Sequence, residues 1–190
     1  SVFADPHSLQ FWMGLVTMWV IGVHKQYGAS YDAKMRSFCK EGEFHAAPGL
    51  KGFPRIMAKA FEYKDEFDLE GFGQKVLSPL YVIDVLRCTY QLPNAERLLE
   101  VRGVVTRVLL NARTKNGYSR KAAAPCGYRD MKLNVLWECG QFGSVVTEVQ
   151  LMLDENARAK QKMHAVYEVM RGDFSSADVD SQVLAKKRMT

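Results

Sequence analysis

The chain has 190 residues, of which 47% are hydrophobic and 25% are charged. These values exclude a disordered or fibrous protein, and the length fits one domain that buries most of its apolar surface without disulfides or metal. The formal charge of +5 combines 26 basic with 21 acidic residues, so only local basic clusters would hold a phosphate-rich partner. We therefore expect no sequence-specific nucleic-acid partner.

The N-terminal region is predicted to be a helical extension over residues 1–49. Ser8 can cap a helix that runs to about Tyr27, and a second, short helix is predicted from Tyr31 to Lys40. Residues 11–23 are nearly all apolar, but they fall short of the ~20 residues that span a bilayer. We expect them to be buried against protein, with no transmembrane span. Residues 41–52 are predicted to form a loop.

Four cysteines are widely spaced, without a C-x-x-C pair: Cys39, Cys88, Cys126 and Cys139. This spacing disfavours a structural zinc site and favours free thiols in a reducing compartment. The chain begins at Ser1 rather than at a methionine, so removal of a targeting peptide stays open. We expect an intracellular protein, with an organelle as the open alternative.

From residue 53 the chain has the apolar spacing of an amphipathic helix. Lys51, Arg55 and Lys59 fall at i, i+4 and i+8, which places three cations along one stripe near the first turn, where helix amides also attract anions. A solvated basic face is the alternative. Residues 80–91 are then predicted to form a buried strand interrupted by Asp84. A carboxylate there indicates a cleft or function, with a structural ion pair as the alternative.

The second half is predicted to be mostly strands. Asn94 caps a helix to about Val105, a strand over residues 108–115 carries Arg113, and residues 115–127 form a basic loop. Strict alternation over 128–137 puts Tyr128 and Lys132 on the face opposite the core. A second strand over 145–153 places Glu148 and Gln150 on one face, and the short connection predicts an antiparallel hairpin. Asp154 caps a helix that ends near Gly172, and residues 173–190 form a polar tail with a basic end.

The order of several short motifs resembles the synthetase domain of RelA/SpoT-type alarmone enzymes. The motifs are D-V-L-R-C-T (84–89), R-T-K-N-G-Y (113–118), G-Y-R-D-M-K-L-N-V (127–135), E-V-Q (148–150) and H-A-V-Y (164–167). The resemblance covers residues 50–171 and is greatest to a divergent branch with a G-Y-R-D motif. It implies a nucleotidyltransferase-like α+β fold, with a mixed, mainly antiparallel sheet flanked by helices.

The resemblance also implies an activity, the magnesium-dependent transfer of pyrophosphate from ATP to the 3′-hydroxyl of a guanosine nucleotide. Tyr128 then resembles the tyrosine that stacks on the acceptor base, and Glu148 with Gln150 resembles the E-x-Q motif with its catalytic glutamate. Arg55 and Lys59 resemble basic residues on the ATP side. We further expect Asp84 and Glu148 to hold Mg²⁺, and Arg113 and Lys132 to bind phosphates.

Three positions depart from the family pattern. Val82 stands where the family has a metal-binding aspartate, Lys132 replaces a histidine, and the arginine that often follows E-V-Q is Met152 or a neighbour. Two hypotheses follow, with a nucleotidyltransferase domain at residues 50–172 in both. The chain is a nucleotide pyrophosphokinase, or it is a degenerate copy that serves as a subunit. In the second, the apolar N-terminal helix and the basic tail dock a protein partner.

Overall fold

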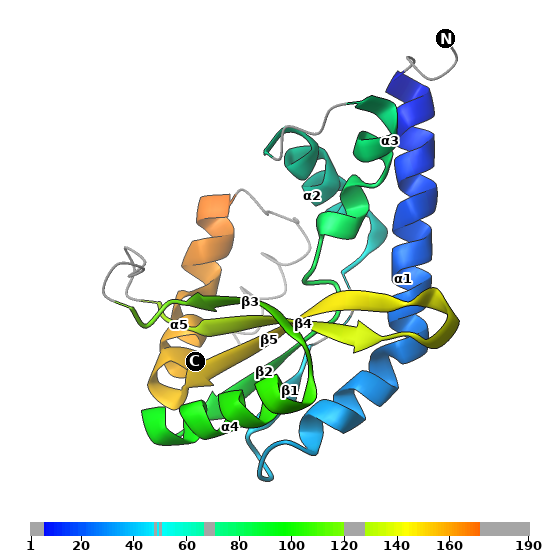
Figure 1. The fold of residues 1–190 in the computed structure, drawn as a ribbon. Coiled ribbons are helices and arrows are strands. Elements are labelled where there is room, and N and C mark those ends of the chain that lie inside the picture. Colours follow the sequence, from blue (N-terminus) through cyan, green and yellow to red (C-terminus); the bar gives the residue numbers. More distant parts are fainter. Residues whose placement is uncertain (1–5, 48, 50, 67–70, 120–127, 172–190) are drawn as a thin grey trace, which may run out of the picture. The chain divides into compact units, whose positions relative to one another are not determined.

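The computed structural model describes residues 6–47, 49, 51–66, 71–119 and 128–171 (Figure 1). The chain divides into two compact units, residues 1–154 and 155–190. The described part of the second unit belongs to the helix α5, Asp154–Arg171. The predicted tail at 173–190 lies outside the described residues.

The first unit begins with one long helix, α1, Pro6–Arg36. The prediction of two helices separated near Gly28 was wrong, because Tyr31 and Met35 at the end of the same helix are fully buried in the core. Burial of these large side chains outweighs the weak helix propensity of the Gly-Ala-Ser sequence at residues 28–30.

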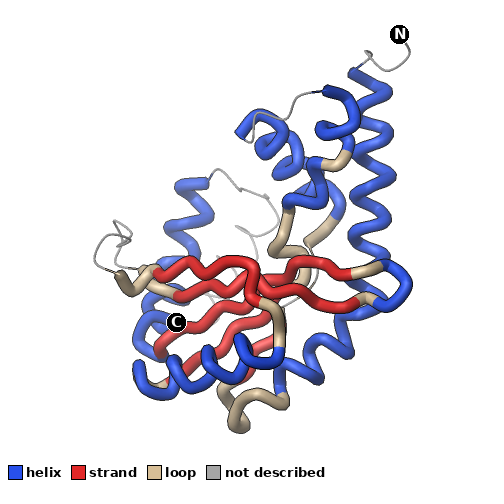
Figure 2. The backbone as a smooth tube through the Cα atoms, in the orientation of Figure 1, coloured by secondary structure: helices blue, strands red, loops and turns tan. Residues whose placement is uncertain are grey.

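The N-terminal half of α1 packs against α2, Phe53–Glu66, α3, Gly71–Val76, and a 3₁₀ helix, Ser78–Tyr81 (Figure 2). The amphipathic helix predicted from residue 53 is thereby confirmed, and Ile56, Met57 and Ala60 form its buried stripe. Their contacts cover only one side of α1.

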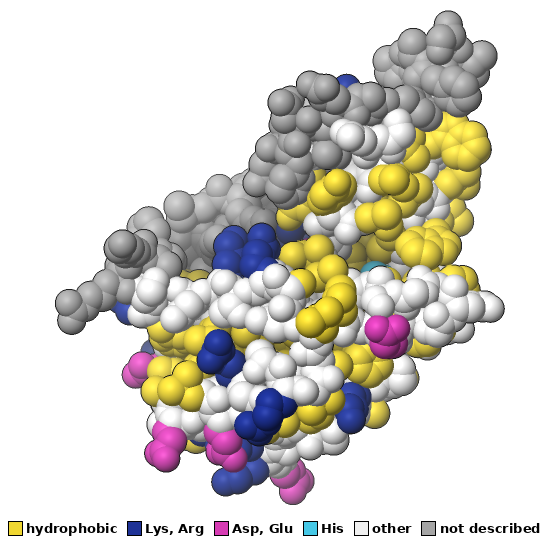
Figure 3. Space-filling view, viewed as in Figure 1, with side chains coloured by type: hydrophobic (Ala, Val, Ile, Leu, Met, Phe, Trp, Pro, Cys, Tyr) yellow, Lys and Arg dark blue, Asp and Glu magenta, His cyan; other side chains and the backbone are white. Residues whose placement is uncertain are grey.

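The apolar segment 11–23 is buried on one face alone. Met13, Val20 and Val23 are buried, whereas Phe11 is 61% and Met18 63% exposed. Figure 3 shows hydrophobic side chains along this half of α1. The prediction that the segment is buried against protein is therefore correct for one face and wrong for the other. Within the described part of the chain, no helix is long and apolar enough to cross a membrane.

Five strands form one mixed sheet in the order β1-β2-β5-β4-β3. Their bounds are β1 Phe44–Ala46, β2 Arg87–Leu92, β3 Asn111–Asn116, β4 Met131–Glu138 and β5 Ser144–Leu153. β2 runs parallel to β5, and every other pair is antiparallel. The mixed, mainly antiparallel sheet and the β4–β5 hairpin are confirmed. Residues 44–46, assigned to the N-terminal extension, form an edge strand instead of loop.

The strand predicted over 80–91 is much shorter in the structure, because pairing starts only at Arg87. Pro79 lies in the 3₁₀ helix, and Val82 and Val85 turn into an apolar cluster with α1 and α2. Asp84 therefore lies in a turn before β2 and not inside a strand.

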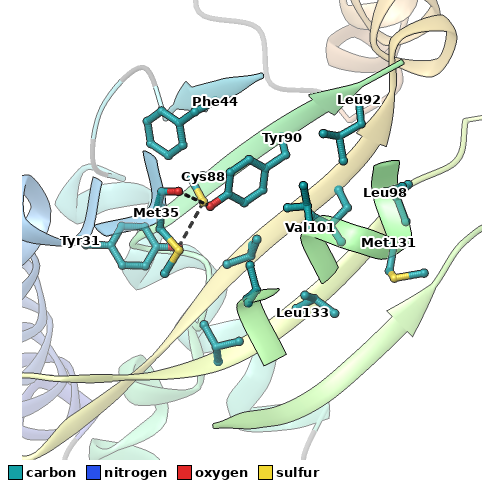
Figure 4. Packing of buried hydrophobic residues seen from close by; sticks show 14 of the residues in the cluster. Tyr31, Met35, Phe44, Cys88, Tyr90, Leu92, Leu98, Val101, Met131 and Leu133 are labelled. Carbon is teal, nitrogen blue, oxygen red and sulfur yellow. Dashed lines mark hydrogen bonds between the residues drawn. The ribbon is translucent and has the colours of Figure 1, made fainter. Parts of the chain in front are cut away.

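The core lies on one face of the sheet, under α4, Ala95–Val108, and the end of α1 (Figure 4). Asn94 caps α4 as predicted, accepting a hydrogen bond from the backbone N–H of Arg97 at 2.9 Å. Buried side chains from β2, β4 and β5 meet those of α4 and α1, and the Tyr90 hydroxyl donates to the Met35 carbonyl at 2.6 Å. The opposite face is left for polar side chains.

Candidate functional site

Two rows of polar side chains cross the sheet on the face opposite the core. Because paired residues project to the same side of a sheet, the strand register defines both rows. The first row contains Arg87, Glu148, Asn134 and Arg113, and the second contains Thr89, Gln150, Lys132 and Lys115. Four of the predicted site residues are thus brought together: Glu148, Gln150, Lys132 and Arg113.

Glu148 lies at the centre of the first row. It is 8% exposed and is flanked in the register by Arg87 and Asn134. The Gln150 side chain donates to Glu148 Oε1 at 2.8 Å, and Gln150 Oε1 accepts from the Thr89 hydroxyl at 3.3 Å. Gln150 therefore fixes the orientation of the Glu148 carboxylate, as hydrogen-bonded side chains do when they are buried.

Tyr128 lies beside these rows, just before β4 begins at Met131. Its hydroxyl donates to Asp130 Oδ2 at 2.8 Å, and Lys132 Nζ lies 3.7 Å from the same oxygen. The pKa of Tyr128 is raised well above its ordinary value. The largest cause is burial, and the charge and hydrogen bond of Asp130 and the charge of Glu148 raise this pKa further. The hydroxyl therefore stays protonated. The sequence analysis missed Asp130, although the G-Y-R-D motif contained it.

Asp84 forms ion pairs with two lysines. Lys51 Nζ contacts Asp84 Oδ2 directly, and Lys59 Nζ lies 3.4 Å from that oxygen. Burial alone would raise the pKa of Asp84, but the hydrogen bond and charge of Lys51, together with Lys59, hold this pKa below its ordinary value. Burial lowers the pKa of Lys51 to about 8. The ion pair that the sequence analysis held as an alternative for Asp84 is present.

Asp84 lies three residues before Arg87, which is the register partner of Glu148. The Glu148 backbone N–H donates to the Leu86 carbonyl at 3.1 Å, which puts the turn carrying Asp84 beside the start of the β2–β5 ladder. Asp84 Oδ1 is buried without a hydrogen-bond partner among the described groups. Arg55 is exposed on α2 and is not among the residues that contact Asp84.

The departure at position 82 has a structural consequence. Val82 is 3% exposed and belongs to the cluster of Val20, Ile56 and Val85. Its side chain is core, so the family's aspartate has no counterpart at that place. Among the residues that the structure describes, no three His, Cys, Asp or Glu side chains form a group that could hold a metal ion.

A cavity of about 250 Å³ lies between α1 and the start of β2. His24, Lys25 and Asp32 line it from α1, and residues 85–87 line it from the other side. The His24 Nδ1–H donates to the Val20 carbonyl at 2.6 Å, and burial lowers the pKa of this imidazole, so Nε2 is left as a buried acceptor without a described partner. The sequence analysis missed this cavity, because only the three-dimensional fold brings α1 beside Arg87.

These elements define an α+β nucleotidyltransferase-like fold with a charged sheet face. The structure is similar to small alarmone synthetase 1 from Bacillus subtilis, with a TM-score of 0.62 and 10% sequence identity over 91% of this chain and 98% of that one. Small alarmone synthetase 2 from the same organism gives a TM-score of 0.60 and 14% identity over 90% and 98%. The resemblance to alarmone synthetases is thereby confirmed for the fold.

A third similar structure is small alarmone synthetase 1 from Bacillus subtilis bound to its product pppGpp. Its TM-score is 0.58, with 11% identity over 88% of this chain and 89% of that one. No family model matches the chain, and no curated protein matches its sequence. At such low identities the likeness is one of fold.

Proposed function

We propose that this chain binds nucleotides on the polar face of its sheet and transfers pyrophosphate from ATP to the 3′-hydroxyl of a guanosine nucleotide. The observation that carries the proposal is the buried Glu148 carboxylate, held by Gln150 in a row that ends in Arg87 and Arg113. Burying a carboxylate costs free energy. The position of Glu148 in a row with two arginines is therefore better explained by a reaction at this group than by a packing role.

The cations on this face suit phosphate groups. Lys132 and Lys115 are neighbours in the second row, so a phosphate group there would meet two positive charges, of which that of Lys132 also lies 3.7 Å from Asp130 Oδ2. Arg113 donates to Asn134 Oδ1 at 2.9 Å, which holds its guanidinium over the sheet. On the other side of the site, Lys59 and the exposed Arg55 come from the same helix and supply positive charge for ATP.

Each group then has a defined part in the reaction. Glu148 accepts the proton of the 3′-hydroxyl while that oxygen bonds to the β-phosphorus of ATP. The bond from the β-phosphorus to the oxygen of the α-phosphate breaks, and AMP leaves. Tyr128 stacks on the acceptor base, as suits its half-buried ring. The similarity in fold to a small alarmone synthetase bound to its product pppGpp supports this assignment.

In this proposal, the carboxylates of Asp84 and Glu148 would hold Mg²⁺. Asp84 Oδ1 is a buried oxygen with no described hydrogen-bond partner, and carboxylate oxygen is the ligand that Mg²⁺ prefers. When bound, the ion would neutralise phosphate charge.

Replacement of the Glu148 carboxylate tests the catalytic role. Glu148→Gln keeps the size of the side chain but removes the base, so pyrophosphate transfer is expected to fall by roughly 10²–10⁴-fold with nucleotide affinity largely kept. Labelled ATP with GDP and Mg²⁺ provides the assay. Glu138→Gln, exposed at the other end of the same hairpin, is the matched control. Equal activity in Glu148→Gln and wild type would reject the role.

The second candidate is a catalytically degenerate copy of the fold that acts as a structural or interaction subunit. Two observations favour it: Val82 is core where the family has an aspartate, and Asp84 is paired with two lysines. In this case the folded protein shows neither transfer nor saturable nucleotide binding, and the exposed apolar face of α1 is its interaction surface.

A further inference from the structure

Asn134, on β4, carries a buried hydrogen-bond donor that has no partner among the described groups. The side chain is 2% exposed, and its Nδ2 atom is the donor without a partner. Most buried polar atoms in proteins are hydrogen-bonded, because a donor left unpaired costs free energy. An unpaired donor within a row of polar side chains therefore indicates a place for an acceptor that a ligand supplies.

The orientation of the Asn134 amide is set by Arg113 of β3. The Arg113 Nε–H donates to Asn134 Oδ1 at 2.9 Å. An N–H donor requires an acceptor, so the oxygen of the amide faces Arg113 and the NH₂ group points away from it. Arg113 is itself exposed, so its guanidinium can shift toward a phosphate group when a ligand enters. The unpaired donor thus has a fixed direction and a movable neighbour.

On the side away from Arg113, Asn134 is paired in the strand register with Glu148 of β5. Side chains paired in this way have Cβ atoms about 4.5–5.5 Å apart on the same face of the sheet. Asn134 Nδ2 nevertheless forms no hydrogen bond with the Glu148 carboxylate, whose Oε1 accepts from Gln150 at 2.8 Å. A donor and a carboxylate thus lie beside each other without bonding. This arrangement suits a ligand with two adjacent groups, one that accepts a hydrogen bond and one that donates.

We propose that Asn134 Nδ2 donates to the 2′-hydroxyl oxygen of the acceptor nucleotide and so selects ribose over 2′-deoxyribose. This inference rests on the proposed function, in which Glu148 accepts the proton of the 3′-hydroxyl. The two hydroxyls of ribose stand on adjacent carbons and on the same side of the ring, so the 2′-oxygen comes beside a neighbour of Glu148. The neighbour on β2 is Arg87, whose charge suits phosphate, and the neighbour on β4 is Asn134. A site that hydrogen-bonds a hydroxyl discriminates against the analogue that lacks it.

Calorimetric titrations of the full chain with GDP and with 2′-deoxy-GDP, in Mg²⁺ and a non-hydrolysable ATP analogue, test this role. Wild type is expected to bind GDP roughly three- to tenfold more tightly than 2′-deoxy-GDP, as one neutral hydrogen bond would give. Asn134→Asp keeps the size of the side chain and an oxygen for Arg113 but removes the donor. It is expected to bind the two nucleotides equally, because its added charge affects both affinities alike. Glu138→Gln, exposed at the other end of the same hairpin, should keep the wild-type ratio.

The possible outcomes separate the role of Asn134 from the proposed function. Saturable GDP binding with the same preference over 2′-deoxy-GDP in wild type and in Asn134→Asp, shown to be folded by circular dichroism, would overturn the role of Asn134 alone. Equal affinity of wild type for the two nucleotides would also overturn this role. That comparison needs no substitution, so it decides the question even if Asn134→Asp does not fold. Absence of saturable GDP binding by folded wild type would overturn both the role of Asn134 and the proposed function.

Discussion

Asp84 forms ion pairs with Lys51 and Lys59. In the proposed nucleotide complex without magnesium, the carboxylate competes with a phosphate group for the same two cations. Asp84→Asn is therefore expected to raise the affinity for ADP several-fold in a magnesium-free calorimetric titration. Glu62→Gln, exposed on α2, the helix that carries Lys59, is the control. An affinity unchanged or lowered by Asp84→Asn would show that phosphate does not enter between the lysines.

Lys51 should make nucleotide binding depend on pH. Burial lowers its pKa from 10.5 to about 8, so the free protein loses this positive charge as the pH rises through about 8. Affinity for a polyphosphate should then fall with rising pH, by at most about tenfold per pH unit. Lys51→Arg keeps its charge and should bind independently of pH across this window. A flat profile in wild type would contradict the assignment.

At the scale of elements, Gly117 sets the connection from β3 toward β4. Its N–H donates to the Asp130 carbonyl at 2.8 Å, and a Cβ placed there would lie 2.5 Å from that oxygen. Gly117→Ala is expected to lower the free energy of unfolding by about 1–3 kcal/mol in urea. Gly103→Ala, in the middle of α4 with space for a methyl group, should raise it by about 0.5–1 kcal/mol. Equal effects would contradict this account.

The elements set by local pattern could be predicted from sequence, and those set by distant contacts could not. The alternation in β4 and β5, the spacing in α2 and the Asn94 cap are all local signals. By contrast, β1 is a strand only because residues 44–46 pair with β2. The apolar residues before Arg87 carry the same strand propensity as β2, but they pack against α1 and α2 instead.

The candidate site also has one part that could be predicted from local sequence pattern and another that depends on contacts between distant segments. Alternation along single strands predicted which faces Lys132, Glu148 and Gln150 occupy, and the register then joined them across the sheet. The contact of Lys51 with Asp84 links the segment before α2 to the turn before β2, and the cavity at His24 links α1 to that turn. No local pattern encodes such contacts between separate elements.

At the scale of the whole molecule, the structure shares the fold of small alarmone synthetases over 90–91% of the chain, at 10–14% identity. The core face explains this likeness, since many apolar side chains can fill the space under α4 and α1. The proposed chemistry depends on fewer residues, which lie on the opposite face of the sheet, on α2 and in the turn before β2. Fold and activity can therefore diverge in this chain, with Val82 as the clearest change.

The central claim is that the polar face of the sheet binds a nucleotide. Its most direct test is a calorimetric titration of the full chain with a non-hydrolysable ATP analogue and GDP in the presence of Mg²⁺. We predict saturable binding that Lys132→Ala and Arg87→Ala weaken, while Lys34→Ala, at an exposed position on α1, does not. Absence of saturable binding by the folded protein, or binding that both substitutions leave unchanged, would contradict the claim.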